Sequence, residues 1–215
     1  MDNFGILNKE QLDALKEVGT IGSGHAANAL SQLAGRKIMI SVPEVKAVPL
    51  KEVVELVGPP ESIVAVVYMN LMGDAQGRSL LIFPRQSAFN LVDILMKRSA
   101  GQTKFLKEID SSAIREVGNI LTGAFLTTLA DFLNIALIPS VPMLAYDMVG
   151  AILEALAIEF GEEADHIFCI QTEFTDPALD IGGNFILVFD RKSLDIMIEK
   201  IDMKIKEMTA NKNRT

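Results

Sequence analysis

The sequence predicts an α/β fold of the α+β type: a pseudo-twofold, duplicated two-layer sandwich. A largely antiparallel sheet should carry two long motif-bearing helices on one face. Three observations lead to this prediction. A long helical stretch recurs along the chain, so that Glu17 corresponds to Glu116. A strand pair joined by a turn also recurs, with Gly77 matching Gly183. The helices carry apolar residues on one side, and such faces are buried by packing in layers.

The first half follows this pattern element by element. Asn8 and Gln11 have the form of a capping box, which predicts the start of a helix, and Gly35 is the expected stop. After that helix the sequence predicts a strand over 37–43, a strand with a turn or short helix over 45–57, a hairpin of strands over 62–72 and 79–83, a helix after Pro84, and a polar linker over 98–104.

The second half restarts the pattern after the linker. Asp110 is a candidate N-cap for a helix over 111–133. After it the sequence predicts a strand over 136–141, a helix over 143–160, an acidic loop over 161–165, a hairpin of strands over 166–174 and 184–189, and a helix opened by Arg191. The repeat of the hairpin is seven positions later than the repeat of the helix would place it, so the second half has a longer middle.

Length and composition favour one folded unit. The chain has 215 residues, 49% of them hydrophobic. We expect a single domain over residues 1–209, built from halves at about 6–98 and 105–208, because each half alone would be short of core. Residues 210–215 are expected to form a disordered polar tail.

Charge and cysteine usage exclude several classes of function. A net charge of −8 disfavours nucleic acids and anionic membrane surfaces as partners. Cys169 is the only cysteine and lies in an apolar context typical of a buried small residue. His25 and His166 lack neighbouring ligands, so no metal site is expected. No apolar run has the ~20 residues of a membrane span, and we expect a cytoplasmic protein without membrane insertion.

The stretch from Ser112 to Gly123 carries the chemistry. Read as a helix, it places Ser112, Glu116, Asn119 and Gly123 on one stripe. A carboxamide donates and accepts hydrogen bonds at once, which suits it to orienting a water molecule for attack. The carboxylate beside it can anchor a cation of a partner. The glycine would let another surface come close.

The competing interpretation is an ordinary solvated helix face, where Glu and Asn are common. The repetition of the spacing favours a function, because the fold alone does not require polar residues to recur there. The first copy reads Asp13, Glu17 and Thr20, with Thr20 in place of the amide, and Pro43 corresponds to Pro142. The glycines at 19, 22 and 24 superficially suggest a phosphate loop. No strand precedes them, so we interpret them as helix packing.

These residues resemble the CheC family of chemotaxis phosphatases, which includes CheX and the phosphatase part of FliY. The pattern of Asp or Ser, three residues, Glu, two residues, Asn, twenty-two residues and Pro is complete in the second half. The resemblance extends from about Ile6 to Met208. It implies a hydrolase that dephosphorylates the aspartyl-phosphate of the response regulator CheY. Glu116 and Asn119 would be the catalytic pair, supported by Ser112 and Pro142.

The resemblance also implies further partners and limits. Mg²⁺ would belong to CheY, and the chain would need no cofactor of its own. The first site, with Thr20, would be weak or inactive, and Pro43 would support its motif. CheD, a receptor deamidase, is an implied second partner; the matching helix would include Asp147, Met148 and Ile152. The chain would act as a monomer. The alternative function is a non-catalytic module that docks CheD or sequesters CheY.

Overall fold

The computed structural model describes residues 7–42, 45–48, 52, 56–160, 167–176 and 179–212. The first half contains α1 (Lys9–Ala34), β1 (Met39–Ser41), β2 (Val45–Val48), β3 (Ile63–Gly73), β4 (Gly77–Pro84) and α3 (Arg85–Leu95). The second half contains α4 (Glu108–Leu133), β5 (Leu137–Pro139), β6 (Met143–Met148), α5 (Val149–Phe160), β7 (Ile167–Asp176), β8 (Leu179–Phe189) and α6 (Arg191–Lys212).

The eight strands form one sheet in which the two halves exchange their short strands. The order is β1-β7-β8-β4-β3-β5, with β2 also paired to β7 and β6 also paired to β3. Every one of these pairings is antiparallel. The short strands of each half therefore lie against the hairpin of the other half, and β4 and β8 meet in the centre. This arrangement confirms the predicted fold class and its pseudo-twofold character.

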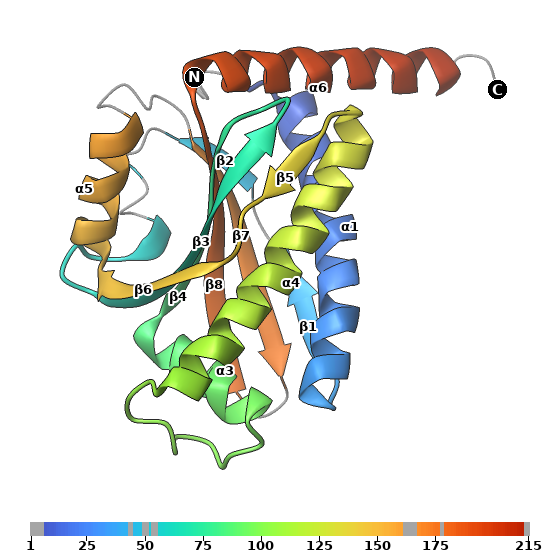
Figure 1. Cartoon of the computed structure of the whole chain (residues 1–215). Coiled ribbons are helices and arrows are strands. Elements are labelled where there is room, and N and C mark those ends of the chain that lie inside the picture. The colour runs from blue at the N-terminus through green and yellow to red at the C-terminus, as the bar shows by residue number, and fades with distance from the viewer. Residues whose placement is uncertain are drawn as a thin grey trace.

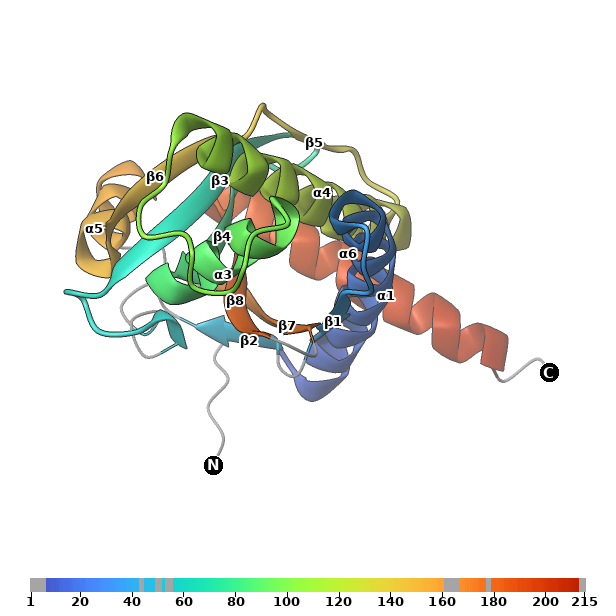
Figure 2. The ribbon, with the colours of Figure 1, turned by 90° about the horizontal axis from the view of Figure 1, so that it is seen from below.

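Helices lie on both faces of the sheet (Figure 1). Alternate residues of each strand point to opposite faces. On β3, Ala65 and Val67 join the larger core beneath α1, α3, α4 and α6, whereas Val64 and Val66 face the smaller core beneath α5. The two motif-bearing helices, α1 and α4, lie side by side on one face of the sheet in both views (Figures 1 and 2). Helix α5, which the sequence did not place on the other face, occupies the longer middle of the second half.

Helix α1 begins and ends where its sequence predicts. Asn8 N donates to Gln11 Oε1 at 2.7 Å, and Gln11 N donates to Asn8 Oδ1 at 3.0 Å, which completes the capping box. The helix stops at Gly35, whose φ of 67° is left-handed and therefore favours glycine. The first motif helix is thus delimited by local sequence alone.

Helix α4 begins three residues earlier than predicted. Its first residue is Glu108, and Asp110 lies in the first turn as a buried side chain instead of preceding the helix. Lys107 N donates to Asp110 Oδ2 at 2.9 Å. The expected N-cap position of Asp110 is therefore wrong, because its carboxylate faces inward toward Arg98, 2.6 Å away.

The polar linker over 98–104 is folded back onto α3. Asp93, at the end of that helix, is fully buried. Its Oδ1 accepts hydrogen bonds from the backbone N of Thr103 at 2.9 Å and from Thr103 Oγ1 at 2.6 Å. Arg98 donates to Thr103 Oγ1 at 2.9 Å and also reaches Asp110. The segment between the halves thus joins the end of α3 to the start of α4.

The predicted helix over 143–160 is wrong in its first third. Residues Met143–Met148 form strand β6, and only Val149–Phe160 is helical. The edge of β3 supplies backbone partners along β6, from Tyr68 opposite Met143 to Ile63 opposite Met148. Met, Leu and Ala have high helix propensity, so the residue types in this segment did not indicate a strand. Pairing with a partner strand overrides propensity here.

The C-terminal boundary also differs from the expectation. Helix α6 continues to Lys212, so residues 210–212 belong to a helix and not to the expected tail. The acidic loop over 161–165, His166, Pro43 and residues 213–215 lie outside the described residues. The single domain over residues 1–209 stays a prediction, and the continuous sheet and a core drawn from both halves are what such a domain needs.

Candidate active site

Helix α4 turns its two polar motif residues outward and the two residues between them inward. Glu116 and Asn119 are exposed, whereas Val117 and Gly118 are buried. A Cβ atom at position 118 would overlap the side chain of Val67 on β3. Glycine therefore lets the helix lie directly on the sheet at this point. The sheet supports the turn that carries the carboxylate and the carboxamide.

The outer stripe of α4 continues on both sides of this pair. Ser112 is exposed, and its Oγ accepts a hydrogen bond from Arg115 Nη2 at 2.9 Å. The same nitrogen lies 3.2 Å from Glu108 Oε1. At the other end, a Cβ atom added to Gly123 would meet no atom within 4 Å. The space above Gly123 is open, as the predicted approach of another surface requires.

The first copy of the motif has the same orientation on α1. Asp13, Glu17 and Thr20 are exposed. Thr20 Oγ1 donates its proton to Lys16 O at 2.8 Å, one turn back along the same helix. The Thr20 side chain is shorter than that of Asn, and its hydroxyl donates its only proton to a backbone carbonyl of the same helix. The site on α1 therefore has a carboxylate anchor without the two-way hydrogen-bonding group of the site on α4.

The two motif helices are packed directly against each other. A Cβ atom at Gly22 of α1 would lie 2.9 Å from Phe125 Cδ1 of α4. The close crossing supports the interpretation of the α1 glycines as packing residues. Gly24 differs, since its Cβ position is open like that of Gly123. One buried and one open glycine thus have separate roles on the same helix.

Pro142 lies half-buried in the connection between β5 and β6. Ser140, two residues earlier, fixes this connection to β3: Asn70 N donates to Ser140 Oγ at 3.0 Å, and Ser140 N donates to Asn70 O at 2.9 Å. Val141 is 78% exposed. Pro142 therefore follows a segment that is hydrogen-bonded to β3 and exposes the apolar side chain of Val141. Its counterpart Pro43 lies outside the described residues.

The three residues expected to share a helix for CheD do not share one. Asp147 and Met148 end strand β6 and are exposed, with Met148 N donating to Asp147 Oδ1 at 2.8 Å. Ile152 lies on α5, half-buried against the smaller core. The expected single helix is therefore wrong, although the three positions still lie close along the chain where β6 meets α5.

The first turn of α4 contains a buried carboxylate, that of Asp110. Burial would raise the pKa of Asp110, but the contact with Arg98 and the hydrogen bond from Lys107 N outweigh it, so the pKa is lowered. The charge of Asp110 therefore has a structural role, through its ion pair with Arg98. Within the described residues, no group of three His, Cys, Asp or Glu side chains is placed to hold a metal ion.

Chemically, the stripe offers one carboxylate and one carboxamide. The carboxylate can bind a cation, and the amide can orient a water molecule. Among the described helices, none is long and apolar enough to cross a bilayer. Glu116 and Asn119 both lie on an exposed face of α4.

Comparison with known proteins relates the chain to one family. The profile of the CheC-like family matches residues 10–46 and 109–146, which contain both copies of the motif. The CheY-P phosphatase CheC of Bacillus subtilis is 36% identical over 178 residues, covering 82% of this chain and 85% of that protein. The chain belongs to the CheC-like family. The flagellar motor switch phosphatase FliY of the same organism is 30% identical over 125 residues, 58% of this chain and 32% of that protein.

Solved structures of other chains share the fold. FliY of Thermotoga maritima superposes with a TM-score of 0.73 at 24% identity, covering 93% of this chain and 99% of that one. The FliM middle domain of H. pylori superposes with a TM-score of 0.67 at 14% identity, covering 90% and 99%. The fold is therefore shared with chains that are only 24% and 14% identical to this one.

Sequence reasoning missed the residues that surround the motif. Arg98, Asp93 and Asp110 tie the start of α4 in place, yet the first two fall in or beside a segment that reads as a plain polar linker. Arg85 and Tyr146 line a pocket beside the stripe. They lie on α3 and β6, and no spacing in the sequence relates them to Glu116.

Proposed function

We propose that this protein hydrolyses the aspartyl-phosphate of phosphorylated CheY. The observation that carries the proposal is the outward pairing of Glu116 and Asn119 over the inward Val117 and Gly118. The Bacillus subtilis relative, which is named a CheY-P phosphatase, supports it. Of the two motif helices, only α4 carries the amide, and this favours the second half of the chain as the working site.

In the proposed reaction, water attacks the phosphorus atom of the phosphoaspartate. The bond between phosphorus and the aspartyl oxygen breaks, which releases phosphate and restores the carboxylate of the regulator. Asn119 accepts a hydrogen bond from the attacking water and donates one to an oxygen nearby, so the water is held in line with the bond that breaks. The amide is chemically unchanged, and no covalent intermediate forms on this chain.

Glu116 positions Asn119 by binding the regulator. Its exposed carboxylate would pair with a lysine in the active site of CheY, so that the amide one turn along α4 enters that site. Mg²⁺ held by CheY would supply charge neutralisation at the phosphoryl group. The Gly123 end of the stripe lets the regulator approach the helix without a side chain between them.

The site on α1 is proposed to bind the regulator weakly and to hydrolyse slowly. Misplacement of a catalytic group by ~1 Å can cost about a hundredfold in rate. Thr20 is shorter than Asn and donates to Lys16 O instead of to a ligand. The chain would thus work with one active face, and we propose that it does so as a monomer.

A binding module remains the second candidate. Met148 is 45% exposed at the junction of β6 and α5, beside the exposed Asp147. Such a surface would suit docking of CheD. If Asp147→Lys abolished signalling while Asn119→Ala preserved it, docking or sequestration would be the function and hydrolysis incidental.

The decisive experiment measures phosphate release from phosphorylated CheY in the presence of Mg²⁺. Wild type should accelerate release, and Asn119→Ala should lose about 100- to 1,000-fold, the scale for one positioned transition-state group. Glu116→Ala should mainly raise KM. Asn28→Ala, which removes an exposed amide elsewhere on α1, is the matched control and should match wild type. An unchanged decay with wild type would overturn the catalytic proposal.

A further inference from the structure

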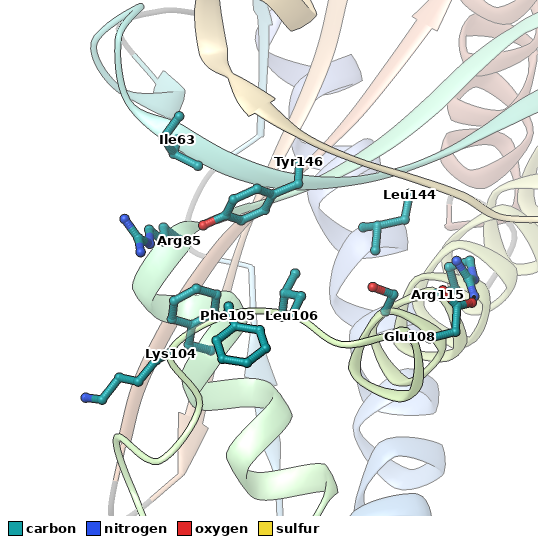
Figure 3. Close-up of a pocket in the computed structure, with 11 residues that line it drawn as sticks. Ile63, Arg85, Lys104, Phe105, Leu106, Glu108, Arg115, Leu144 and Tyr146 are labelled. Carbon is teal, nitrogen blue, oxygen red and sulfur yellow. Dashed lines mark hydrogen bonds and ion pairs between the residues drawn. The ribbon is translucent and has the colours of Figure 1, made fainter.

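A pocket of about 500 Å³ opens beside the motif stripe of α4 (Figure 3). Its walls come from four parts of the fold: α3, the 98–107 connection, the first two turns of α4, and strand β6 with neighbouring β3. Segments from both halves of the chain therefore meet around it. The pocket is not used by the chemistry assigned to Glu116 and Asn119.

The pocket has apolar and aromatic walls that remain open to solvent. The rings of Phe89 and Tyr146 stack with centroids 6.4 Å apart. Phe89 is buried, but Tyr146 is 43% exposed. Phe105, on the opposite wall, is 66% exposed. Exposed aromatic side chains around a hollow are typical of sites that receive a side chain from a partner.

The rim of the pocket is cationic, although the protein as a whole is acidic. Arg85, Lys104 and Arg115 line it together with a single carboxylate, Glu108. Arg85 and Lys104 are exposed, and Figure 3 shows the Lys104 amine pointing outward from the wall. Against a chain charge of −8, this local excess of positive charge selects an acidic occupant.

Arg115 joins the pocket to the motif stripe. It lines the pocket, and its Nη2 donates to Ser112 Oγ at 2.9 Å, the first residue of the stripe. Ser111 of the pocket directly precedes Ser112. A molecule bound over Glu116 and Asn119 would therefore continue into the pocket without leaving the surface.

We propose that this pocket docks an acidic segment, bearing one bulky apolar side chain, of the same phosphorylated regulator that Asn119 acts on. The inference rests on the proposed function. Rim charges around an apolar hollow fit a protein segment, whose acidic residues meet the rim while its apolar side chain fills the centre. The pocket contacts the regulator before and during hydrolysis alike, so it contributes to KM and not to kcat.

The test uses the full chain with a charge reversal at the rim, Arg85→Glu with Lys104→Glu. Dephosphorylation of CheY should show KM raised about tenfold with kcat unchanged, because rim charges act on association. Affinity for CheY loaded with beryllofluoride and Mg²⁺ should fall by the same factor. Lys37→Glu with Lys206→Glu makes the same charge change at exposed positions that do not line the pocket, and it should change neither quantity.

A second variant tests the apolar part of the pocket. Phe105→Ser should also raise KM and weaken binding, and it should fold, because Phe105 is 66% exposed. Ile158→Ser removes an apolar side chain that is 79% exposed on α5 and is the control. Wild-type KM should rise with ionic strength, and the double reversal should show a flatter dependence.

The outcomes separate the two proposals. If Asn119→Ala is inactive while the rim and Phe105 variants bind and turn over like wild type, the docking proposal is wrong and the catalytic one stands. If Asn119→Ala keeps full activity, the catalytic proposal fails, and the binding assay alone decides whether the pocket docks the regulator. A fall in kcat at unchanged affinity would also overturn docking.

Discussion

Arg98 and Asp110 form an ion pair that ties the connection between the halves to the first turn of the motif helix. Arg98 Nη2 lies 2.6 Å from Asp110 Oδ1, and the Asp110 side chain is 1% exposed. The other carboxylate oxygen accepts from Lys107 N. Glu116 lies about two turns further along α4. The Arg98–Asp110 ion pair therefore holds in place the end of the helix that leads into the stripe.

Replacing Arg98 should destabilise the fold strongly. Arg98→Met leaves the Asp110 charge buried without its partner, for which about 3 kcal/mol of unfolding free energy is expected to be lost. Urea denaturation measures this loss. Lys204→Met removes a cation from an exposed pair with Glu207 and should cost less than about 1 kcal/mol. Equal effects of the two substitutions would contradict a structural role for the buried pair.

Asp110 should also make stability depend on pH in the acid range. Its folded pKa is lowered, so folding favours the charged form. That contribution is present above the unfolded pKa of ~3.9 and is lost as pH falls through the lower folded value. Asp110→Asn should reduce the slope of stability against pH below about 4. Urea denaturation across the acid range measures this slope, and an unchanged slope in Asp110→Asn would contradict the prediction.

The repeat made most of the fold predictable. Because Glu17 and Glu116 recur in register with their strands, the duplicated sandwich, its hairpins and the outward motif faces followed from sequence. Strand β6 did not, since Met143–Met148 becomes a strand only by pairing with β3. The side of the sheet on which α5 packs likewise depends on a long-range contact that no local pattern encodes.

The site was predictable only where its residues share one helix. Glu116, Asn119 and Ser112 are related by helical spacing, so a stripe could be inferred. Arg98 and Tyr146 approach that stripe from other elements. The sequence also placed Asp110 before the helix. An Asp at the N-cap and a buried Asp in the first turn differ by only a few positions, so the residue type alone does not distinguish them.

Gly118 should resist substitution because α4 lies on Val67 there. Gly118→Ala improves helix propensity by about 1 kcal/mol, yet its Cβ would overlap the Val67 side chain. We expect net destabilisation of about 1–3 kcal/mol, the range for overpacking, together with a lower kcat as the stripe shifts. Val67→Ala should partly restore both. Gly24→Ala, at an open position of α1, should be neutral or stabilising.

Ser79 offers a stability gain inside the sheet. It is 1% exposed, and its hydroxyl has no hydrogen-bond partner among the described residues. Ser79→Ala removes an unsatisfied polar group and should stabilise the fold by about 1 kcal/mol. Ser193→Ala is the matched control: that buried hydroxyl accepts from Gln76 N at 2.7 Å, and its loss should destabilise. Thermal unfolding distinguishes the opposite signs, and a destabilised Ser79→Ala would show that the hydroxyl is satisfied.

Thr20→Asn should transfer activity to the first helix. In an Asn119→Ala background, the α4 site lacks its amide, so any recovered phosphate release must come from α1. Asn supplies a longer arm and a donor that is not committed to Lys16 O, beside the exposed Glu17. We expect recovery of about tenfold or more over the single variant, part of the hundredfold cost of ~1 Å misplacement. Adding Glu17→Ala should remove it. If phosphate release does not recover while the variant still binds the regulator, Thr20 is not the reason why the α1 site is inactive.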